Sequence, residues 1–310
     1  MSMRNVSALD PCDWCPCHRR ETPDKSFAVF NFNKKRVPWK TACFSPQYWR
    51  ANIAPRHVLF DRLSYLSQMS CENDELHILH LGVNQTLIGS AIWTLVYRSM
   101  HGDYHQNLEA FWTAMTDYYV EHDVEVRFTS FSGSAFHDPS KPRLDFPRLK
   151  GRGIEVKHSL WPVRHIFREH ARPMDDDRLA MRALDAMCDI QDIFEQYSDE
   201  YFLPRPEAKR VLELCNNFLA DYASLSTRAS AAGDLLWPCI PKHHVFYHMC
   251  DRAQYSHPRL GNCCLDEDYV NRVKRIVVSD AAGSSLHRIP GKVLAKMLWG
   301  KSLLHRCGFA

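Results

Sequence analysis

The sequence has no apolar run near the ~20 residues that a transmembrane helix requires, so we expect no membrane span. Residues 1–17 lack both the basic start and the apolar core of a secretory signal peptide. Neither sign of charge dominates, since the formal net charge is only +3, and 45% of the 310 residues are hydrophobic. Such a chain folds around a substantial core and is not disordered. We therefore expect a folded nuclear or cytoplasmic protein.

Several familiar site signatures are missing as well. Gly133, Gly151 and Gly153 lack the spacing of a phosphate-binding loop or a dinucleotide-binding fingerprint. His244 and His248 are one helical turn apart, but no acid stands between them, which excludes the His-Glu-x-x-His motif of zinc proteases. We interpret these histidines as core residues or as groups that contact phosphate. No unit of roughly 20–50 residues repeats, so the chain is not a solenoid.

The chain has 12 cysteines, and in a reducing compartment most of them are expected to be free or metal-bound. A Cys-x-x-Cys turn places Cys12 and Cys15 on one tetrahedral ion, and Cys17 or His18 could add a third ligand. No second Cys-x-x-Cys exists, and two distant candidates for the remaining ligand are Cys43 and His57. A redox role is less favoured, because no strand precedes the turn. The sequence predicts a structural zinc site here, with a metal-free loop as an equal alternative.

Helical periodicity dominates, so we expect a mostly α fold with few strands (α+β). Residues 1–58 are irregular and contain many prolines. Two helices are predicted within residues 73–122, and the first should bury one face between residues 87 and 96. Residues 124–128 alternate in character and predict a strand or an extended link. Further helices are expected, in chain order, around residues 160–167, 184–197, 212–225, 242–253 and 266–279, and after Pro290.

Acidic residues stand at the start of two of these helices. Asp74 is followed three positions later by His77, directly before the apolar run. Glu267, flanked by Asp266 and Asp268, precedes another apolar series. By spacing alone, such acids are helix caps or partners of the helix dipole. An acid at the entrance of a buried helix is also held rigidly, as a metal-binding carboxylate must be.

Four segments of the chain together resemble a known family. In chain order they are residues 73–83, 146–160, 240–249 and 265–269. Their order and content resemble motif segments of large cut-and-paste DNA transposases, the CACTA and Kyakuja–Dileera–Zisupton groups. The resemblance implies an RNase H-like core, here incomplete, that is interrupted by a large helical insertion.

The resemblance also implies a chemistry. Asp74 and Glu267 would be catalytic acids that bind Mg²⁺, with His77 beside them, and Asp266 or Asp268 could replace Glu267. In two-ion catalysis one ion activates the attacking oxygen and the other stabilises the leaving oxygen. The family's first catalytic Asp lies upstream of its cysteine pair, which would place it before Met1. We therefore expect an N-terminally truncated remnant that is inactive alone.

DNA is the partner that the resemblance implies. Lys242 is a candidate for phosphate contact, and basic residues follow Tyr269, among them Arg272, Lys274 and Arg275. A solvated helix face explains the basic C-terminal segment equally well.

The sequence suggests four parts. Residues 1–58 form an irregular segment with the possible zinc site, and residues 59–150 form a partial RNase H-like core with the second acidic motif. Residues 151–253 form the helical insertion, and residues 254–310 carry the third acidic motif and basic helices. Two alternatives to a transposase remnant remain open: a helical DNA- or protein-binding module, and a zinc-stabilised scaffold without catalysis.

Overall fold

The computed structural model describes residues 12–18, 28–32, 37–52, 62–63, 65–138, 140, 145–263, 274–275 and 278. The chain divides into two compact units, residues 1–262 and 263–310. In the second unit Lys274 and Arg275 are helical and exposed. The predicted residues Glu267 and Arg272 lie outside the described residues, as does His57.

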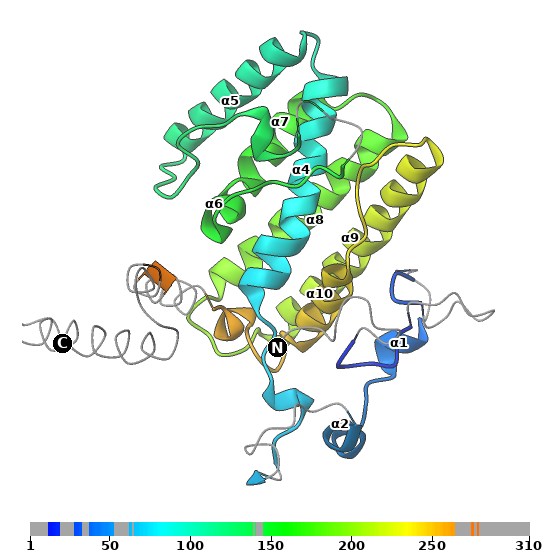
Figure 1. The fold of residues 1–310 in the computed structure, drawn as a ribbon. Coiled ribbons are helices and arrows are strands. Elements are labelled where there is room, and N and C mark those ends of the chain that lie inside the picture. The colour runs from blue at the N-terminus through cyan, green and yellow to red at the C-terminus, as the bar shows by residue number, and fades with distance from the viewer. Residues whose placement is uncertain are drawn as a thin grey trace, which may run out of the picture. The chain divides into compact units, whose positions relative to one another are not determined.

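The first unit is an assembly of helices, shown in Figure 1. The described helices are, in chain order, α1 (Pro38–Thr41), α2 (Pro46–Asn52), η2 (Gln68–Ser70), η3 (Leu76–Val83), α4 (Asn84–Thr94), η4 (Leu95–Ser99), α5 (Tyr104–Glu121), η5 (Gly133–Ala135), α6 (Gly153–His158), α7 (Leu160–His170), α8 (Asp175–Gln196), α9 (Arg205–Ala231), α10 (Pro241–Arg252) and η6 (Pro258–Gly261). The expected mostly α fold is confirmed. In the described part of the chain, the only β pairing is an isolated bridge between His18 and Ala28, so the sheet of an RNase H-like core is not among these elements.

Helix α4 is the centre of the first unit. The sequence predicts one buried face, but the structure buries all residues of α4, including its polar ones. η3 and η4, which continue this helix at both ends, contain π-helical turns. Such turns are rare and recur at functional sites. The long central helix thus carries a local irregularity at each end.

Local sequence signals explain the long outer helices. Asp103 caps α5 and accepts a hydrogen bond from the backbone of Gln106, whose side chain accepts one from the Asp103 backbone. Three aspartates occupy the first turn of α8, where the helix dipole favours negative charge. α9 pairs with α8, and Arg182 of α8 holds Asp221 of α9 in a bidentate ion pair. The helices predicted for these regions are therefore present.

Two other expectations need refinement. Residues 124–128 form no strand, so the extended link is what the structure contains. Residues 254–262, grouped with the C-terminal part in the sequence-based division, are bonded to the first unit. His257 donates its backbone N–H to the Tyr201 carbonyl at 2.7 Å, and the Asn262 amide donates to Glu75 at 2.9 Å. The boundary between compact units accordingly follows residue 262.

The burial of His80 should make the stability of the first unit decrease at acidic pH. It lies 3.7 Å from Glu75, with Lys157 and His158 of α6 nearby, and burial lowers the pKa of His80 to about 3. An unfolded histidine titrates near 6.5. Below that pH only the unfolded state takes up this proton, so the free energy of unfolding falls by about 1.4 kcal/mol per pH unit until about pH 3.

Glu75 acts with the opposite sign. Burial raises its pKa, so its contribution to stability is present at low pH and is lost as the pH rises above 4.5. Urea unfolding between pH 4.5 and 7 should therefore compare Glu75→Gln with the Glu75→Gln, His80→Leu double variant. The double variant is expected to show a shallower loss of stability toward acid, and equal slopes would contradict the assignment.

Candidate metal centre and candidate groove

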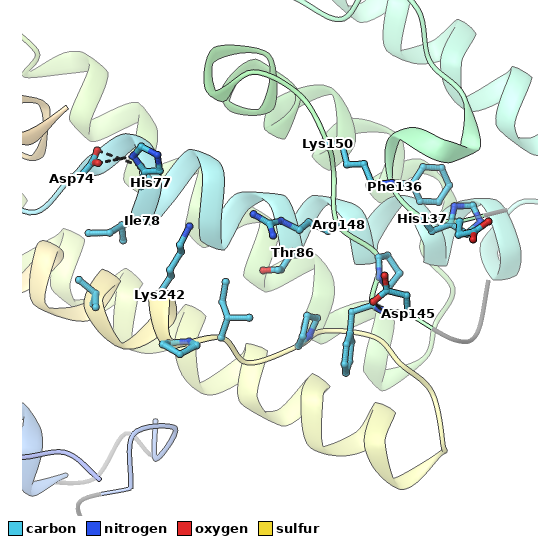
Figure 2. Close-up of a pocket in the computed structure, with 17 residues that line it drawn as sticks. Asp74, His77, Ile78, Thr86, Phe136, His137, Asp145, Arg148, Lys150 and Lys242 are labelled. Carbon is cyan, nitrogen blue, oxygen red and sulfur yellow. Dashed lines mark hydrogen bonds and ion pairs between the residues drawn. The ribbon is translucent and has the colours of Figure 1, made fainter. Parts of the chain in front are cut away.

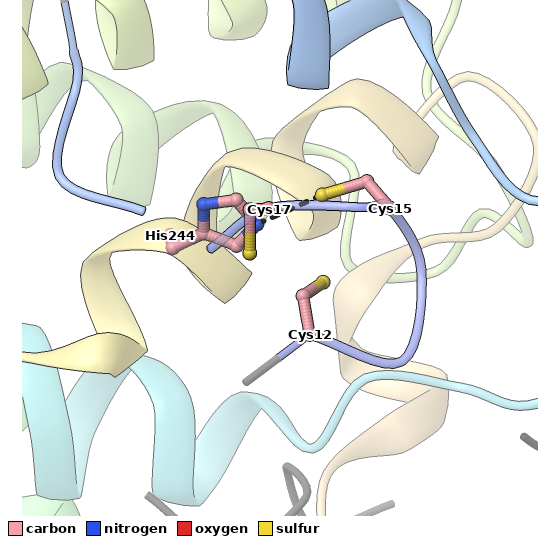
Figure 3. A group of neighbouring side chains, drawn as sticks. All are labelled: Cys12, Cys15, Cys17 and His244. Carbon is pink, nitrogen blue, oxygen red and sulfur yellow. Dashed lines mark hydrogen bonds between the residues drawn. The ribbon is translucent and has the colours of Figure 1, made fainter. Parts of the chain in front are cut away.

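Three cysteines and one histidine form a buried group. Cys12, Cys15 and Cys17 come from the N-terminal loop and His244 comes from α10 (Figure 3). Their ligand atoms all lie within 4.8 Å of one another, and each side chain is at most 1% exposed. Thiolate and imidazole are the usual ligands of tetrahedral zinc. The group could therefore hold a structural metal such as zinc.

The position of His244 is fixed on both sides of its ring. Nδ1 faces the Val29 carbonyl at 3.2 Å, and Nε2 lies 3.2 Å from the Cys15 sulfur. Because a carbonyl only accepts, Nδ1 carries the proton and Nε2 offers its lone pair. A backbone carbonyl that fixes the tautomer in this way is the usual outer-shell partner of a metal-binding histidine.

Aromatic side chains enclose the group. Trp39 of α1 packs on His244 with ring centroids 4.0 Å apart, and it also contacts His248 at 5.8 Å. Trp14, inside the cysteine loop, stacks on His248 and lies under the Arg252 guanidinium at 4.3 Å. The loop and α10 are thus held together by packing as well as by polar contacts.

The thiols are electrostatically unequal. Burial by itself would raise the pKa of Cys12, but hydrogen bonds from Cys15 and Cys17 and the nearby His248 and His244 lower it well below its usual value. Burial raises the pKa of Cys15, and the hydrogen bond to Cys12 raises that of Cys17. The hydrogen bonds within the group and the two histidines therefore favour one thiolate among the three thiols.

The ligand prediction from sequence is met in part. Cys12, Cys15 and Cys17 come together as expected, whereas His18 is outside the group and pairs with Ala28 in the β-bridge. Cys43 is also outside it. The sequence predicts His244 to be a core or phosphate-contacting residue, whereas the structure places it in the group. The available signal was complementary spacing, because Cys-x-x-Cys and His-x-x-x-His are the two halves of a common zinc ligand pattern.

A cavity of about 830 Å³ lies along η3 and α4. Four segments that are far apart in sequence contribute most of its lining, within residues 74–78, 136–138, 145–150 and 238–245, and Thr86 of α4 adds to it. Figure 2 shows Asp74 and His77 at one end and Phe136 and His137 at the other, with Lys242 and Arg148 between them. Three of the four segments that carry the transposase resemblance therefore meet in one cavity.

Two cations of the cavity converge on one carbonyl. Lys242 donates to the Leu81 oxygen at 2.8 Å, and Arg148 approaches the same oxygen at 3.4 Å. Leu81 has non-helical φ and ψ angles inside η3, which turns its carbonyl out of the regular helical pattern. Burial lowers the pKa of Lys242, Arg148 lowers it further, and Asp74 raises it.

No protein-family model, no curated protein and no solved structure matches this chain. In the described helices, none is long and apolar enough to cross a membrane.

Asp74 and His77 form a close pair. Oδ2 of Asp74 lies 2.6 Å from Nδ1 of the His77 ring, and Oδ1 accepts the His77 backbone N–H at 3.3 Å. The expected proximity of these two residues is present, and Asp74 also serves as a helix-capping side chain. Both residues are partly exposed.

The predicted magnesium site of Asp74 and Glu267 stays a prediction, because Glu267 lies outside the described residues. Mg²⁺ prefers oxygen ligands, chiefly carboxylates. Among the residues that the structure describes, no three carboxylates lie within 4.8 Å of one another. The carboxylates of the cavity, Asp74, Asp138 and Asp145, form no such group.

Proposed function

We propose that this chain is a non-cleaving, DNA-binding relative of cut-and-paste transposases whose helical unit is stabilised by zinc. The observation that carries the proposal is the meeting of residues 74–78, 146–150 and 240–245 in one cavity. The meeting of these segments at one place is consistent with a shared role in the parent family. The resemblance concerns the ancestry of the chain, and the cavity is where we propose that DNA binds.

The cations of the cavity support a phosphate-bearing ligand. Arg148, Lys150 and Lys242 line it from two of the three segments. Arg148 is oriented by Gln85, whose side-chain oxygen accepts its Nε–H at 2.7 Å. An oriented guanidinium and an ammonium are the groups that most often contact DNA phosphates.

Zinc accounts for the buried cysteine loop. Structural zinc supplies folding free energy in small metal-binding segments that have little core of their own. The loop reaches α10 through the contact of Cys15 with His244 and through Trp14, which stacks on His248. In this proposal the metal fastens the N-terminal segment to the helix that also carries Lys242.

Binding to short duplex DNA tests the proposal. Fluorescence anisotropy should show binding that weakens with salt, because phosphate contacts release counterions. Lys242→Gln and Arg148→Gln are each expected to weaken binding about tenfold and to reduce the salt slope by about 1, whatever the DNA sequence. Lys209→Gln, an exposed lysine of α9 outside the cavity, is the matched control.

Two results would contradict the proposal. Equal binding by the cavity variants and the Lys209 control would place DNA elsewhere or leave only the scaffold alternative. Cleavage in Mg²⁺ or Mn²⁺ that Asp74→Ala abolishes would show that the chain is an enzyme. We expect no cleavage, since a two-ion site needs several converging carboxylates and no three carboxylates of the described residues lie within 4.8 Å of one another.

A further inference from the structure

His248 is buried beside the metal group but is not one of its four residues. Its Nε2 is 3.2 Å from Nε2 of His244, one turn earlier on α10. The ring is 2% exposed, and among the described residues this contact is its only hydrogen bond. The four donors that all lie within 4.8 Å of one another, Cys12, Cys15, Cys17 and His244, do not include His248. Through its contact with His244, His248 is a fifth potential donor beside the four positions of tetrahedral zinc.

A metal on His244 changes what His248 can do. Once Nε2 of His244 gives its lone pair to an ion, it can no longer accept a proton from His248. The Nε2 atom of His248 would then face a bound nitrogen at 3.2 Å with no partner. A buried polar group without a hydrogen bond costs free energy, so the arrangement favours a metal bond for His248 as well.

The spacing of the two nitrogens agrees with shared coordination. Zn–N bonds of about 2.0–2.1 Å in a tetrahedron place two imidazole nitrogens about 3.3 Å apart. The observed separation of 3.2 Å is close to that value. His244 and His248 are also related by one helical turn, which keeps both rings on the same side of α10.

An uncoordinated Cys17 thiol costs less free energy than an uncoordinated His248 ring. A free thiol behaves as a small hydrophobic group in a protein interior. Two thiolates and two neutral imidazoles also give a zinc centre without net charge, whereas three thiolates and one imidazole give a centre of charge −1. Because the surroundings are buried, the neutral centre has the smaller desolvation cost.

We propose that Cys12, Cys15, His244 and His248 bind the ion and that Cys17 packs beside them without binding it. This assignment rests on the proposed zinc. The N-terminal turn and α10 each supply two ligands, so the ion joins two segments that are far apart in the sequence. His248, which the sequence predicts to be a core or phosphate-contacting residue, is then a metal ligand.

Metal titration of the full chain separates the two ligand sets. We compare zinc affinity and the visible spectrum of the Co²⁺ form, whose thiolate charge-transfer intensity reports the number of bound sulfurs. His248→Ala is expected to weaken zinc binding more than about 100-fold, and Cys17→Ser by about tenfold at most, with one ion and two thiolates retained. His243→Ala and Cys250→Ser, buried on α10 but outside the group, serve as controls.

The reverse ranking would overturn the assignment. If Cys17→Ser removes the ion and a thiolate signal while His248→Ala binds normally, the centre has three cysteines. Comparable losses in both variants would also contradict it. If the unaltered chain binds neither zinc nor Co²⁺, the zinc proposal itself fails, and DNA binding then remains a separate question.

Discussion

Removing the proposed zinc from the purified chain is expected to lower the midpoint of thermal unfolding by about 10 °C. An ion at 1,000 times its dissociation constant contributes about 4 kcal/mol to the native state. In a unit of this size, each kcal/mol moves the midpoint by about 2–4 °C. The measurement is calorimetry of metal-loaded protein with and without a strong chelator, followed by addition of excess Zn²⁺, which should restore the original midpoint.

Cys15→Ser separates metal loss from effects of the chelator. Its sulfur lies 3.2 Å from His244, so the variant should unfold at the low midpoint and should not respond to chelator. Cys188→Ser is the matched control, because Cys188 is equally buried in α8 but lies outside the metal group. It should lose some stability from its core position yet keep its response to chelator. A chelator that leaves the unaltered chain unchanged would show that packing alone holds the loop.

The helices were predictable because each carries its own local signals. α8 begins with three aspartates, and α9 has a proline in its first turn and is followed by Gly233, which adopts a positive φ of 74°. Such features act within a few residues, so they can be read without the fold. The burial of α4 on all sides could not be read in this way, since it depends on which helices surround it.

The residues of the metal group also divide into those predictable from local sequence and those that depend on the fold. Cys12, Cys15 and Cys17 are close in sequence, so their convergence was predictable. His244 joins them across 229 positions from Cys15, and only the packing of α10 against the loop brings it there. The convergence of Lys242 and Arg148 on the Leu81 carbonyl is equally non-local. It depends on an irregular turn in η3 that helical periodicity does not predict.

Gly89→Val is expected to cost the first unit about 3 kcal/mol and to disturb the cavity. A Cβ at Gly89 would lie 2.7 Å from the Arg148 backbone and 2.9 Å from the Leu149 nitrogen. These are backbone atoms, which cannot move aside as the end of a flexible side chain can. α4 and residues 147–150 would have to separate, which breaks the 2.9 Å hydrogen bond from the Leu149 N–H to the Gln85 carbonyl.

Urea unfolding measures this cost, and Ala110→Val provides the control. Ala110 is exposed on α5, so valine there changes helix propensity alone and should cost less than about 1 kcal/mol. If the proposed DNA binding by the cavity holds, displacing the Arg148 backbone from Gln85 should also weaken that binding. If the Gly89→Val protein has the same free energy of unfolding as the control, residues 147–150 can move away from α4 without loss of stability. The close approach to α4 could not then be what positions Arg148 in the cavity.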